Sequence, residues 1–316
     1  MTKIPTQNFI EDICNKDFFM RTLPLKPDRF GKSNATLVYK PSETNSIKAV
    51  LYIHGFIDYF FQWELAEFYN KLGYNFFAVD LRRYGRSLDN AQKPNIINAV
   101  EDYYEEINAA LQIMKNELGN EYIIINGHST GGLIASLYAN DFPKKIDALI
   151  LNSPFFEFNV SAIEKFVLLP VIKLLHNLIP EKGMDSLTEV YPKSLSKDHY
   201  GEWDFNLTWK PIENFPAFFA WLHAIRNGHL RVQKGLNIKV PILVLFSDKS
   251  YKGKKYSAEA QICDSVLDVN DIRKYSDNLG VNITKIEIKN GMHDLILSKK
   301  DVREEVYHQM KIWMQI

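Results

Sequence analysis

The sequence has few cysteines and no excess charge of either sign. Only Cys14 and Cys263 occur among 316 residues, which is too few for a disulfide framework or a thiolate metal site and fits a reducing compartment. The 38 basic and 38 acidic residues leave no net charge. Nothing in the composition favours a nucleic acid or an acidic surface as a partner.

Long hydrophobic runs are also missing. Residues 1–8 contain no apolar targeting core, so we expect no secretion signal. The most apolar later stretch, residues 166–172, is bracketed by charged residues and is too short to span a bilayer. The sequence therefore predicts a soluble, cytoplasmic protein without an integral membrane segment.

Strand-like and helical segments alternate along most of the chain. With 46% hydrophobic residues, the chain can bury a substantial core. Short segments before residue 48, including 34–40, predict a small antiparallel edge. Later apolar runs predict strands buried on both faces. These runs lie at residues 47–56, 75–80, 122–126, 146–152 and 240–246. The alternation predicts an α/β fold, with a mostly parallel central sheet and helices on both of its faces.

The pattern changes between residues 153 and 236, where the chain becomes aromatic and irregular. We interpret this stretch as a mainly helical cap inserted into a core formed by residues 1–152 and 237–316. Within it, an apolar helix at 162–179 should be kinked by Pro170. We expect this helix to form the core of the cap rather than a mobile lid or a membrane-facing surface.

One stretch carries the strongest chemical signal. Residues 122–137 read as a buried strand, a Gly-x-Ser-x-Gly turn around Ser129, and a helix of small residues. Such a turn exposes a serine hydroxyl at the end of the strand, and glycines are needed where side chains would collide with neighbouring elements. Ser129 is the candidate nucleophile.

A serine nucleophile needs a base and an acid, which follow it in the order acid and then histidine on this kind of scaffold. His293 lies in a turn directly after the last predicted strand and is the candidate base. Two residues compete for the acid: Asp264 is favoured, and Asp248 at the end of the preceding strand is the alternative. Asp268 is better explained as a helix-start residue.

An oxyanion hole should combine the backbone amide of Thr130 with that of Phe56, in the loop after His54. His54 and His128 have no further metal ligand at a suitable sequence spacing, so we expect packing or hydrogen-bonding roles and no metal. For Asp80 and Arg82, we expect a structural turn with a local ion pair rather than substrate contacts.

These motifs together resemble the α/β-hydrolase superfamily, and in particular its branch of monoacylglycerol lipases, lysophospholipases and serine aminopeptidase-like proteins. The resemblance rests on matching segments that span nearly the whole core: His54-Gly55, Asp80-Leu81-Arg82, Gly85-Arg86-Ser87, residues 127–132, 264–268 and 291–294. It implies a cofactor-independent enzyme in which Ser129, Asp264 and His293 form a triad, Phe56 and Thr130 supply the oxyanion amides, and the cap shapes the pocket. The chain departs from the family pattern at Arg83-Tyr84, at the bulky residues 56–59 and in an additional excursion at 249–261.

We therefore expect a serine hydrolase that cleaves a carboxylic ester with a lipid-like or aromatic acyl group, an apolar small molecule, through an acyl-enzyme on Ser129. An aminopeptidase is the first alternative. It would need an acidic anchor for the substrate ammonium, and the cap offers Glu157, Glu164, Glu189, Glu202 and Asp204. A ligand-binding protein that kept the fold without turnover is the second alternative.

Overall fold

The computed structural model describes residues 8–315. The expectation of no targeting segment falls mainly on residues 1–7, which lie outside that range. Among the described residues, no helix combines the length and the apolar character needed to cross a bilayer.

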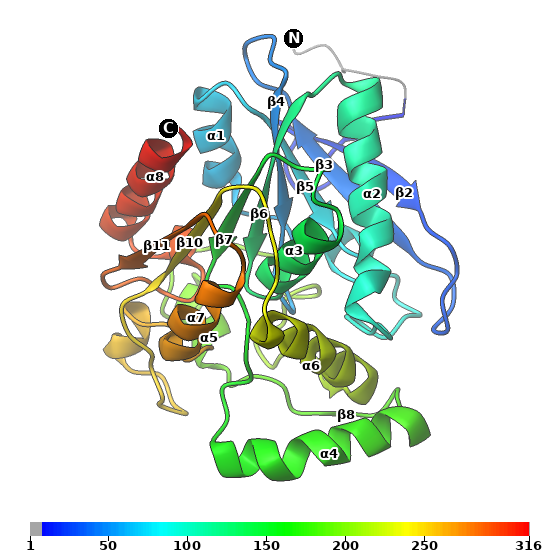
Figure 1. Cartoon of the computed structure of the whole chain (residues 1–316), viewed down its shortest axis with the longest axis vertical. Helices are drawn as coiled ribbons and strands as arrows, with labels where there is room; N and C mark the ends of the chain where they lie inside the picture. The colour runs from blue at the N-terminus through cyan, green and yellow to red at the C-terminus, as the bar shows by residue number, and fades with distance from the viewer. Residues whose placement is uncertain (1–7, 316) are drawn as a thin grey trace.

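A nine-stranded sheet forms the centre of the molecule (Figure 1). Its strands are β1 (Ile10–Glu11), β2 (Phe19–Pro24), β3 (Asn34–Lys40), β4 (Lys48–Ile53), β5 (Asn75–Asp80), β6 (Tyr122–His128), β7 (Ala148–Asn152), β10 (Ile242–Ser247) and β11 (Ile283–Ile288). Their spatial order is β1-β2-β3-β5-β4-β6-β7-β10-β11. The first three strands pair antiparallel, β3 joins β5 antiparallel, and all later pairs are parallel. The predicted antiparallel edge and mostly parallel sheet are confirmed.

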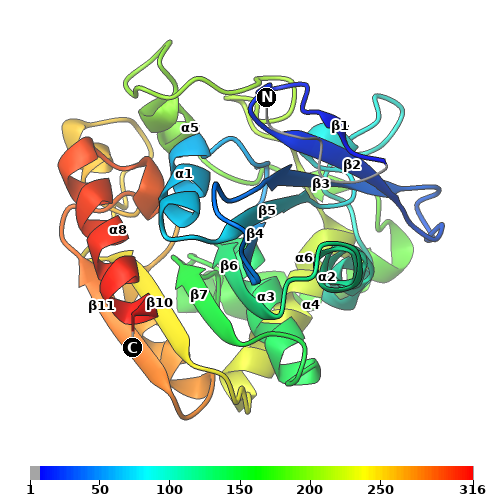
Figure 2. The same cartoon turned by 90° about the horizontal axis from the view of Figure 1, so that it is seen from above.

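Helices cover both faces of this sheet, as Figure 2 shows from above. One face carries α1 (Trp63–Lys71) and α8 (Lys300–Met314). The other carries α2 (Tyr104–Gln112), α3 (Thr130–Asp141) and α7 (Val269–Tyr275), and α6 (Phe219–Lys234) packs on α3. The expected α/β-hydrolase arrangement of layers is confirmed.

Strand β4 shows why the central strands are continuously apolar. Val50 and Tyr52 pack in the core cluster under α1 and α8, whereas Ala49, Leu51 and Ile53 pack in the cluster under α2 and α3. Successive side chains of a strand point to opposite faces. Because both faces are covered, every position from Ala49 to Ile53 is buried and polar alternation is lost.

Between β7 and β10 the chain forms α4 (Ala162–Leu178), β8 (Gly183–Met184), α5 (Val190–Leu195), β9 (Ala217–Phe218) and then α6. The two short strands pair antiparallel. Helix α6 packs against α3, because its Ala224, Ile225 and Val232 belong to the same buried cluster as Leu133 and Leu137 of α3.

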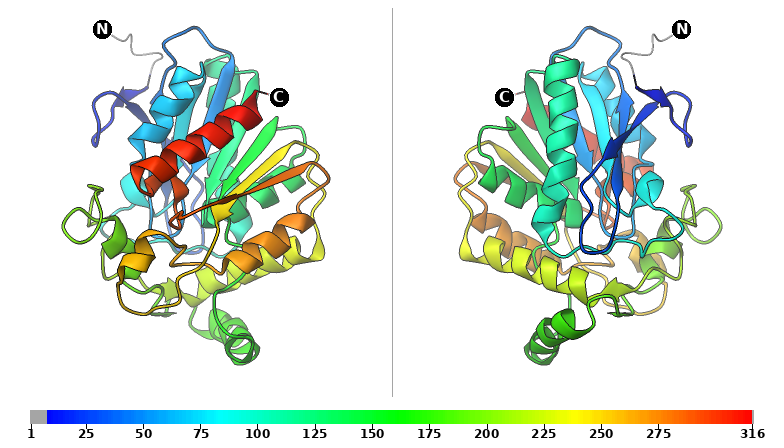
Figure 3. Two further views of the ribbon diagram at one scale, coloured as in Figure 1. Left: turned by 90° about the vertical axis from the view of Figure 1, so that its left-hand side faces the viewer. Right: turned by 90° about the vertical axis from the view of Figure 1, so that its right-hand side faces the viewer.

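Helix α4 differs from our expectation. It continues through Pro170 as one helix and lies apart from the sheet in Figures 1 and 3. Ile172 is buried, and Leu168 and Leu169 are partly buried against the core cluster. Six of its large apolar side chains are exposed: Ile163, Phe166, Val167, Val171, Leu174 and Leu178. The prediction that this helix forms the cap's core is therefore wrong, because only one narrow face has anything to pack against.

Candidate active site

Ser129 occupies the sharp turn between β6 and α3. Its φ of 53° and ψ of −117° place a non-glycine residue in a sparsely populated region, which costs on the order of 1–3 kcal/mol. A Cβ atom on Gly131 would collide with the carbonyl oxygen of Ile53, and one on Gly127 with the backbone of Gly131. The flanking glycines are required because β4 and α3 approach so closely, as the sequence predicted.

The structure brings Ser129, His293 and Asp264 together. The Oγ atom of Ser129 lies 3.0 Å from Nε2 of His293, and Nδ1 of His293 lies 2.9 Å from Oδ2 of Asp264. All three residues are buried. With the Nδ1 proton directed at the carboxylate, Nε2 is free to take the proton of the serine hydroxyl.

Asp264 and Asp248 occupy different environments. Oδ1 of Asp264 accepts hydrogen bonds from the amides of Val266 and Leu267, both at 2.8 Å, which leaves Oδ2 for His293. Oδ1 of Asp248 instead accepts the amide of Asn290 at 2.8 Å and supports the turn after β11. Asp268 caps α7 by accepting the amide of Asn270, so its prediction as a helix-start residue is confirmed. The geometry places Asp264, and not Asp248, against the imidazole.

The amides predicted to form an oxyanion hole belong to residues on one cavity wall. Phe56 and Thr130 both line the cavity beside Ser129. Within residues 8–315, neither backbone N–H has a hydrogen-bond acceptor in the protein. The ring of Phe56 stacks on Trp221 of α6 with 3.9 Å between centroids. Both amides thus remain available to a ligand oxygen.

His54 holds the loop after β4, residues 54–60, which we call the β4 loop. Its Nε2 accepts the amide of Leu81 at 3.1 Å, so Nδ1 carries the proton and donates to the carbonyl of Gly55 at 2.8 Å. Burial lowers the pKa of His54, which keeps the ring neutral. Its expected hydrogen-bonding role fits these contacts.

A second cluster of charged groups lies beneath the site and was missed in the sequence. Nδ1 of His128 is 3.6 Å from Asp58 and 3.9 Å from Asp294. On the other side of Asp58, Nζ of Lys210 is 3.0 Å from Oδ1 and 3.3 Å from the carbonyl oxygen of Ile57. All four charged side chains are buried. Sequence spacing gave no sign of these two carboxylates, because distant segments of the chain bring them to His128.

Charges within this cluster balance when His128 is protonated. Burial disfavours the imidazolium, but the carboxylates of Asp294 and Asp58 outweigh it and raise the pKa of His128. Burial also works against the Asp58 carboxylate, yet Lys210 and His128 hold its pKa well below the usual range. Asp58, His128 and Asp294 lie close enough together to hold a metal ion. Lys210 already supplies a cation to Asp58 and would repel a second one, so we assign no metal here.

A cavity of about 250 Å³ opens beside Ser129 and His293. Its lining is mainly apolar and comes from the β4 loop, the segment after β7 and the helices α4 and α6. The apolar part includes Phe155, Phe158, Leu168, Ile172, Trp221, Leu222 and Val266. Asp58 and Lys210 form part of the polar wall. The arrangement provides an apolar binding site in contact with a serine, an imidazole and two unpaired amides.

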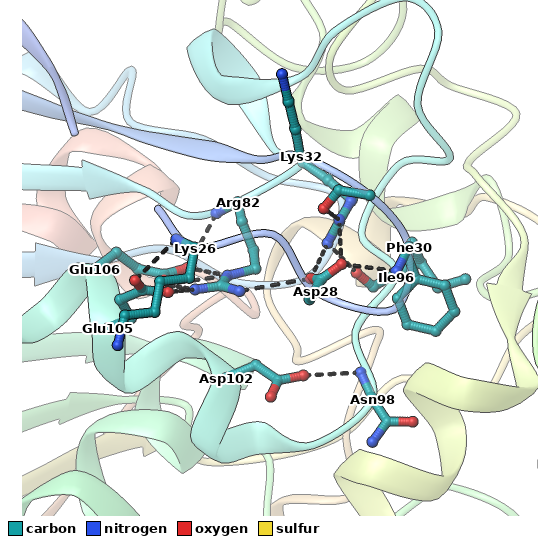
Figure 4. A network of polar contacts seen from close by, with 12 residues as sticks. Lys26, Asp28, Phe30, Lys32, Arg82, Ile96, Asn98, Asp102, Glu105 and Glu106 are labelled. Carbon is teal, nitrogen blue, oxygen red and sulfur yellow. Dashed lines mark hydrogen bonds and ion pairs between the residues drawn. The ribbon is translucent and has the colours of Figure 1, made fainter. Parts of the chain in front are cut away.

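Asp80 and Arg82 support the site from outside the cavity. Asp80 accepts the amide of Phe60 at 2.9 Å and pairs with Arg86 at 2.8 Å. Arg82 pairs with Glu106 at 2.7 Å and Glu105 at 3.0 Å, and Figure 4 shows it between these residues and Asp28. Both residues have the structural role that was expected. They form ion pairs with other side chains rather than with each other: Asp80 with Arg86, and Arg82 with Glu105 and Glu106.

Arg83, where the sequence departs from the expected family pattern, lies in the turn after β5 with a left-handed backbone conformation. Its φ is 63°, and its side chain is buried. The guanidinium forms two hydrogen bonds with Asp28, at 2.8 and 2.7 Å, and one with the carbonyl of Ile96 at 3.2 Å. Such bidentate pairing compensates a buried guanidinium. This network links the β2–β3 connection to the turn after β5.

Comparison with known proteins places these features in a family. The family model described as serine aminopeptidase, S33, matches residues 44–298. A probable lysophospholipase L2 from Haemophilus influenzae is 22% identical over 300 residues, which covers 90% of each chain. Epoxide hydrolase 1 from Caenorhabditis elegans is 30% identical over 117 residues, but the match covers 36% of this chain and spans only 27% of the worm protein.

Solved structures share the fold. The monoacylglycerol lipase of Paleococcus ferrophilus superposes with a TM-score of 0.67 at 18% identity, covering 89% of this chain and 98% of the lipase. Since the family model matches well over half of the sequence, the chain belongs to the serine aminopeptidase S33 family and has the α/β-hydrolase fold.

Proposed function

We propose that this protein is a serine hydrolase that cleaves carboxylic esters through an acyl-enzyme on Ser129. The continuous contact from Ser129 through His293 to Asp264, at the wall of an apolar cavity, carries this proposal. Relatives named as lipases, esterases and a lysophospholipase support the same class of reaction.

In this proposal, His293 takes the hydroxyl proton as Ser129 attacks the ester carbonyl. The amides of Phe56 and Thr130 stabilise the negative oxygen of the tetrahedral intermediate. His293 then gives its proton to the departing alcohol, which leaves the acyl group on Ser129. A water molecule, activated by His293, releases the acid and restores the serine. Asp264 orients the imidazole and stabilises its charged form throughout.

The cavity favours a small, apolar substrate. Its volume of about 250 Å³ lies slightly below the range of about 300–1,000 Å³ typical of ligand pockets. We therefore propose butyrate-like rather than palmitate-like acyl groups. Residues 153–236 act as the cap in this proposal, and residues 1–152 and 237–316 form the core. Free Cys14 and Cys263 fit the reducing cytoplasm that we propose as the location.

An aminopeptidase remains the second candidate because of the family to which the chain belongs. The five acidic residues considered as anchors are already engaged. Glu157 contacts Arg226, Glu189 contacts Lys193, Glu202 contacts Arg303 and Asp204 contacts Lys197, whereas Glu164 belongs to the capping box of α4. None of the five lines the cavity. We therefore place ester cleavage first; turnover of aminoacyl-naphthylamides without ester cleavage would reverse this order.

Replacement of the nucleophile tests the proposal. We expect Ser129→Ala to abolish hydrolysis of p-nitrophenyl butyrate and labelling by a fluorophosphonate probe. Ser136→Ala is the matched control, because Ser136 lies in α3 and its hydroxyl only donates to the carbonyl of Gly132. Full activity and labelling in the folded Ser129→Ala variant would refute the proposal. Binding of an apolar ligand by the wild-type protein, with no turnover of any activated ester, would instead favour the binding-protein alternative.

A further inference from the structure

Lys210 connects the cap segment to the β4 loop. It lies between α5 and β9, lines the cavity and is only 5% exposed. Its ammonium group contacts Oδ1 of Asp58 at 3.0 Å and the carbonyl oxygen of Ile57 at 3.3 Å. A buried ammonium needs such partners. Both of them belong to the loop that carries the Phe56 amide.

Ile57 makes this contact informative. Its φ is 50°, which is a genuine outlier for a β-branched residue. A strained conformation of this kind persists only where the surrounding structure holds it in place. The carbonyl group bound by Lys210 belongs to this residue, one position after Phe56. Lys210 therefore binds the strained residue that directly follows Phe56.

The Lys210–Asp58 ion pair is part of a row of buried charged residues that lies beneath the catalytic residues. Asp58 lies beside His128, which directly precedes Ser129, and His128 lies beside Asp294, which directly follows His293. Asp294 is held in turn by Asn152 at 2.6 Å. Lys210 thus connects the cap segment to a buried chain of charges that touches the β4 loop, the nucleophile turn and the histidine turn, as does Tyr191 of α5, whose hydroxyl accepts the amide of Asp294 at 3.2 Å.

We propose that Lys210 is a positioning residue, which couples the cap to the oxyanion hole by holding the strained β4 loop through Ile57 and Asp58. The proposal rests on the proposed ester hydrolysis for its catalytic consequence. Lys210 does not contact the reacting atoms in this account. Its loss should therefore affect transition-state stabilisation more than substrate binding.

Kinetics of Lys210→Met with p-nitrophenyl butyrate provide the first test. Loss of one oxyanion donor lowers kcat by about 10²–10³-fold, and a partly displaced loop should lower it by about 10- to 100-fold with little change in KM. Inhibition by a trifluoromethyl ketone, which forms a tetrahedral adduct, should weaken in parallel. Lys210→Arg should restore most of the activity. Lys197→Met, at an exposed ion pair in the same segment, is the control and should behave as the wild type.

A second set of variants separates this effect from loss of folding. Lys210→Met leaves the Asp58 carboxylate buried without its ammonium partner, so Asp58→Asn/Lys210→Met removes both charges together. We expect this double variant to fold and to show the same fall in kcat. In an Ile57→Gly background, where the positive φ carries no strain, the fall caused by Lys210→Met should be smaller. Equal falls in both backgrounds would overturn the proposed coupling.

Hydrogen exchange gives a readout that does not depend on ester turnover. Amides of residues 54–60 should exchange faster in Lys210→Met than in the wild type. Their exchange rates should be unchanged in Lys197→Met. If the wild type cleaves no ester but exchange still responds to Lys210, the proposed function fails and the structural coupling stands. If the wild type cleaves esters but Lys210→Met changes neither kcat nor exchange, the coupling is wrong. A rise in KM with unchanged kcat would also overturn it, because Lys210 would then bind substrate directly.

Discussion

Residues with a strained backbone follow four neighbouring parallel strands, at the carboxyl ends of these strands, where the site lies. Apart from asparagines, the residues between 8 and 315 that have a positive φ and are not glycine are Ile57, Arg83, Ser129 and Ser153. They come one to four residues after the ends of β4, β5, β6 and β7, respectively. Strain of this kind clusters where the surrounding fold can enforce it and function requires it. The fold therefore holds the β4 loop and the nucleophile turn together, at the carboxyl ends of these strands.

Asp264 should be essential for orientation of the base. In Asp264→Asn, the side-chain amide can donate where the carboxylate accepted, which favours the wrong imidazole tautomer and should lower kcat by about 10⁴-fold. Asp248→Asn is the matched control, because its remaining oxygen can still accept the amide of Asn290. Steady-state kinetics of both purified variants check this. A larger loss of kcat in Asp248→Asn than in Asp264→Asn would show that Asp248, and not Asp264, is the catalytic acid.

His128 should make stability depend on pH. Its pKa is raised above the ordinary value of 6.5, so the folded state binds its proton more tightly than the unfolded state does. The resulting stabilisation is complete at pH values below 6.5 and is lost as the pH rises through the folded-state pKa. We expect the melting temperature of the wild type to fall as the pH rises through this range, and that of His128→Gln to lack this fall. Parallel pH profiles for the two proteins would show that His128 carries no stabilising charge.

Among the elements, α4 shows that apolar composition does not by itself indicate burial. A capping box formed by Ser161 and Glu164 starts this helix, and only a narrow face then finds a neighbour. Phe166 is 83% exposed, whereas Ile172, on the same helix, is 2% exposed and lines the cavity.

This contrast predicts opposite effects of two substitutions in α4. Phe166→Ser should change the free energy of unfolding by no more than about 0.5 kcal/mol, as is usual for surface positions. Ile172→Ala removes buried methyl groups and should cost about 2–5 kcal/mol. Urea unfolding of both variants measures the difference. A larger cost for Phe166→Ser would mean that the outer face of α4 is covered in solution.

At the scale of the whole molecule, local sequence patterns predicted the helices and strands better than they predicted the contacts between them. The strands β4 to β7 and β10 were predictable because strands covered on both faces are continuously apolar. Residues 100–117 have helical periodicity in the sequence, but they form a 3₁₀ turn at Val100–Tyr103, then α2, then a π-helical turn at Ile113–Glu117. Helical periodicity alone does not distinguish these closely related forms.

The candidate site divides in the same way. Ser129 and His293 lie in turns with recognisable sequences, so they could be predicted. The choice between Asp264 and Asp248 depends on where the excursion after β10 returns to the sheet, and no local pattern encodes that. Lys210 lies 152 residues from Asp58, and nothing in the sequence around it indicates a buried ion pair.

Identification of the covalent intermediate tests the central claim most directly. The wild-type protein should release a burst of one equivalent of p-nitrophenol per molecule from an activated ester whose acyl-enzyme hydrolyses slowly. Mass spectrometry of the quenched protein should then find one acyl group, on the peptide that contains Ser129, and no adduct in Ser129→Ala. An adduct on another residue, or steady turnover of esters by Ser129→Ala, would contradict the account.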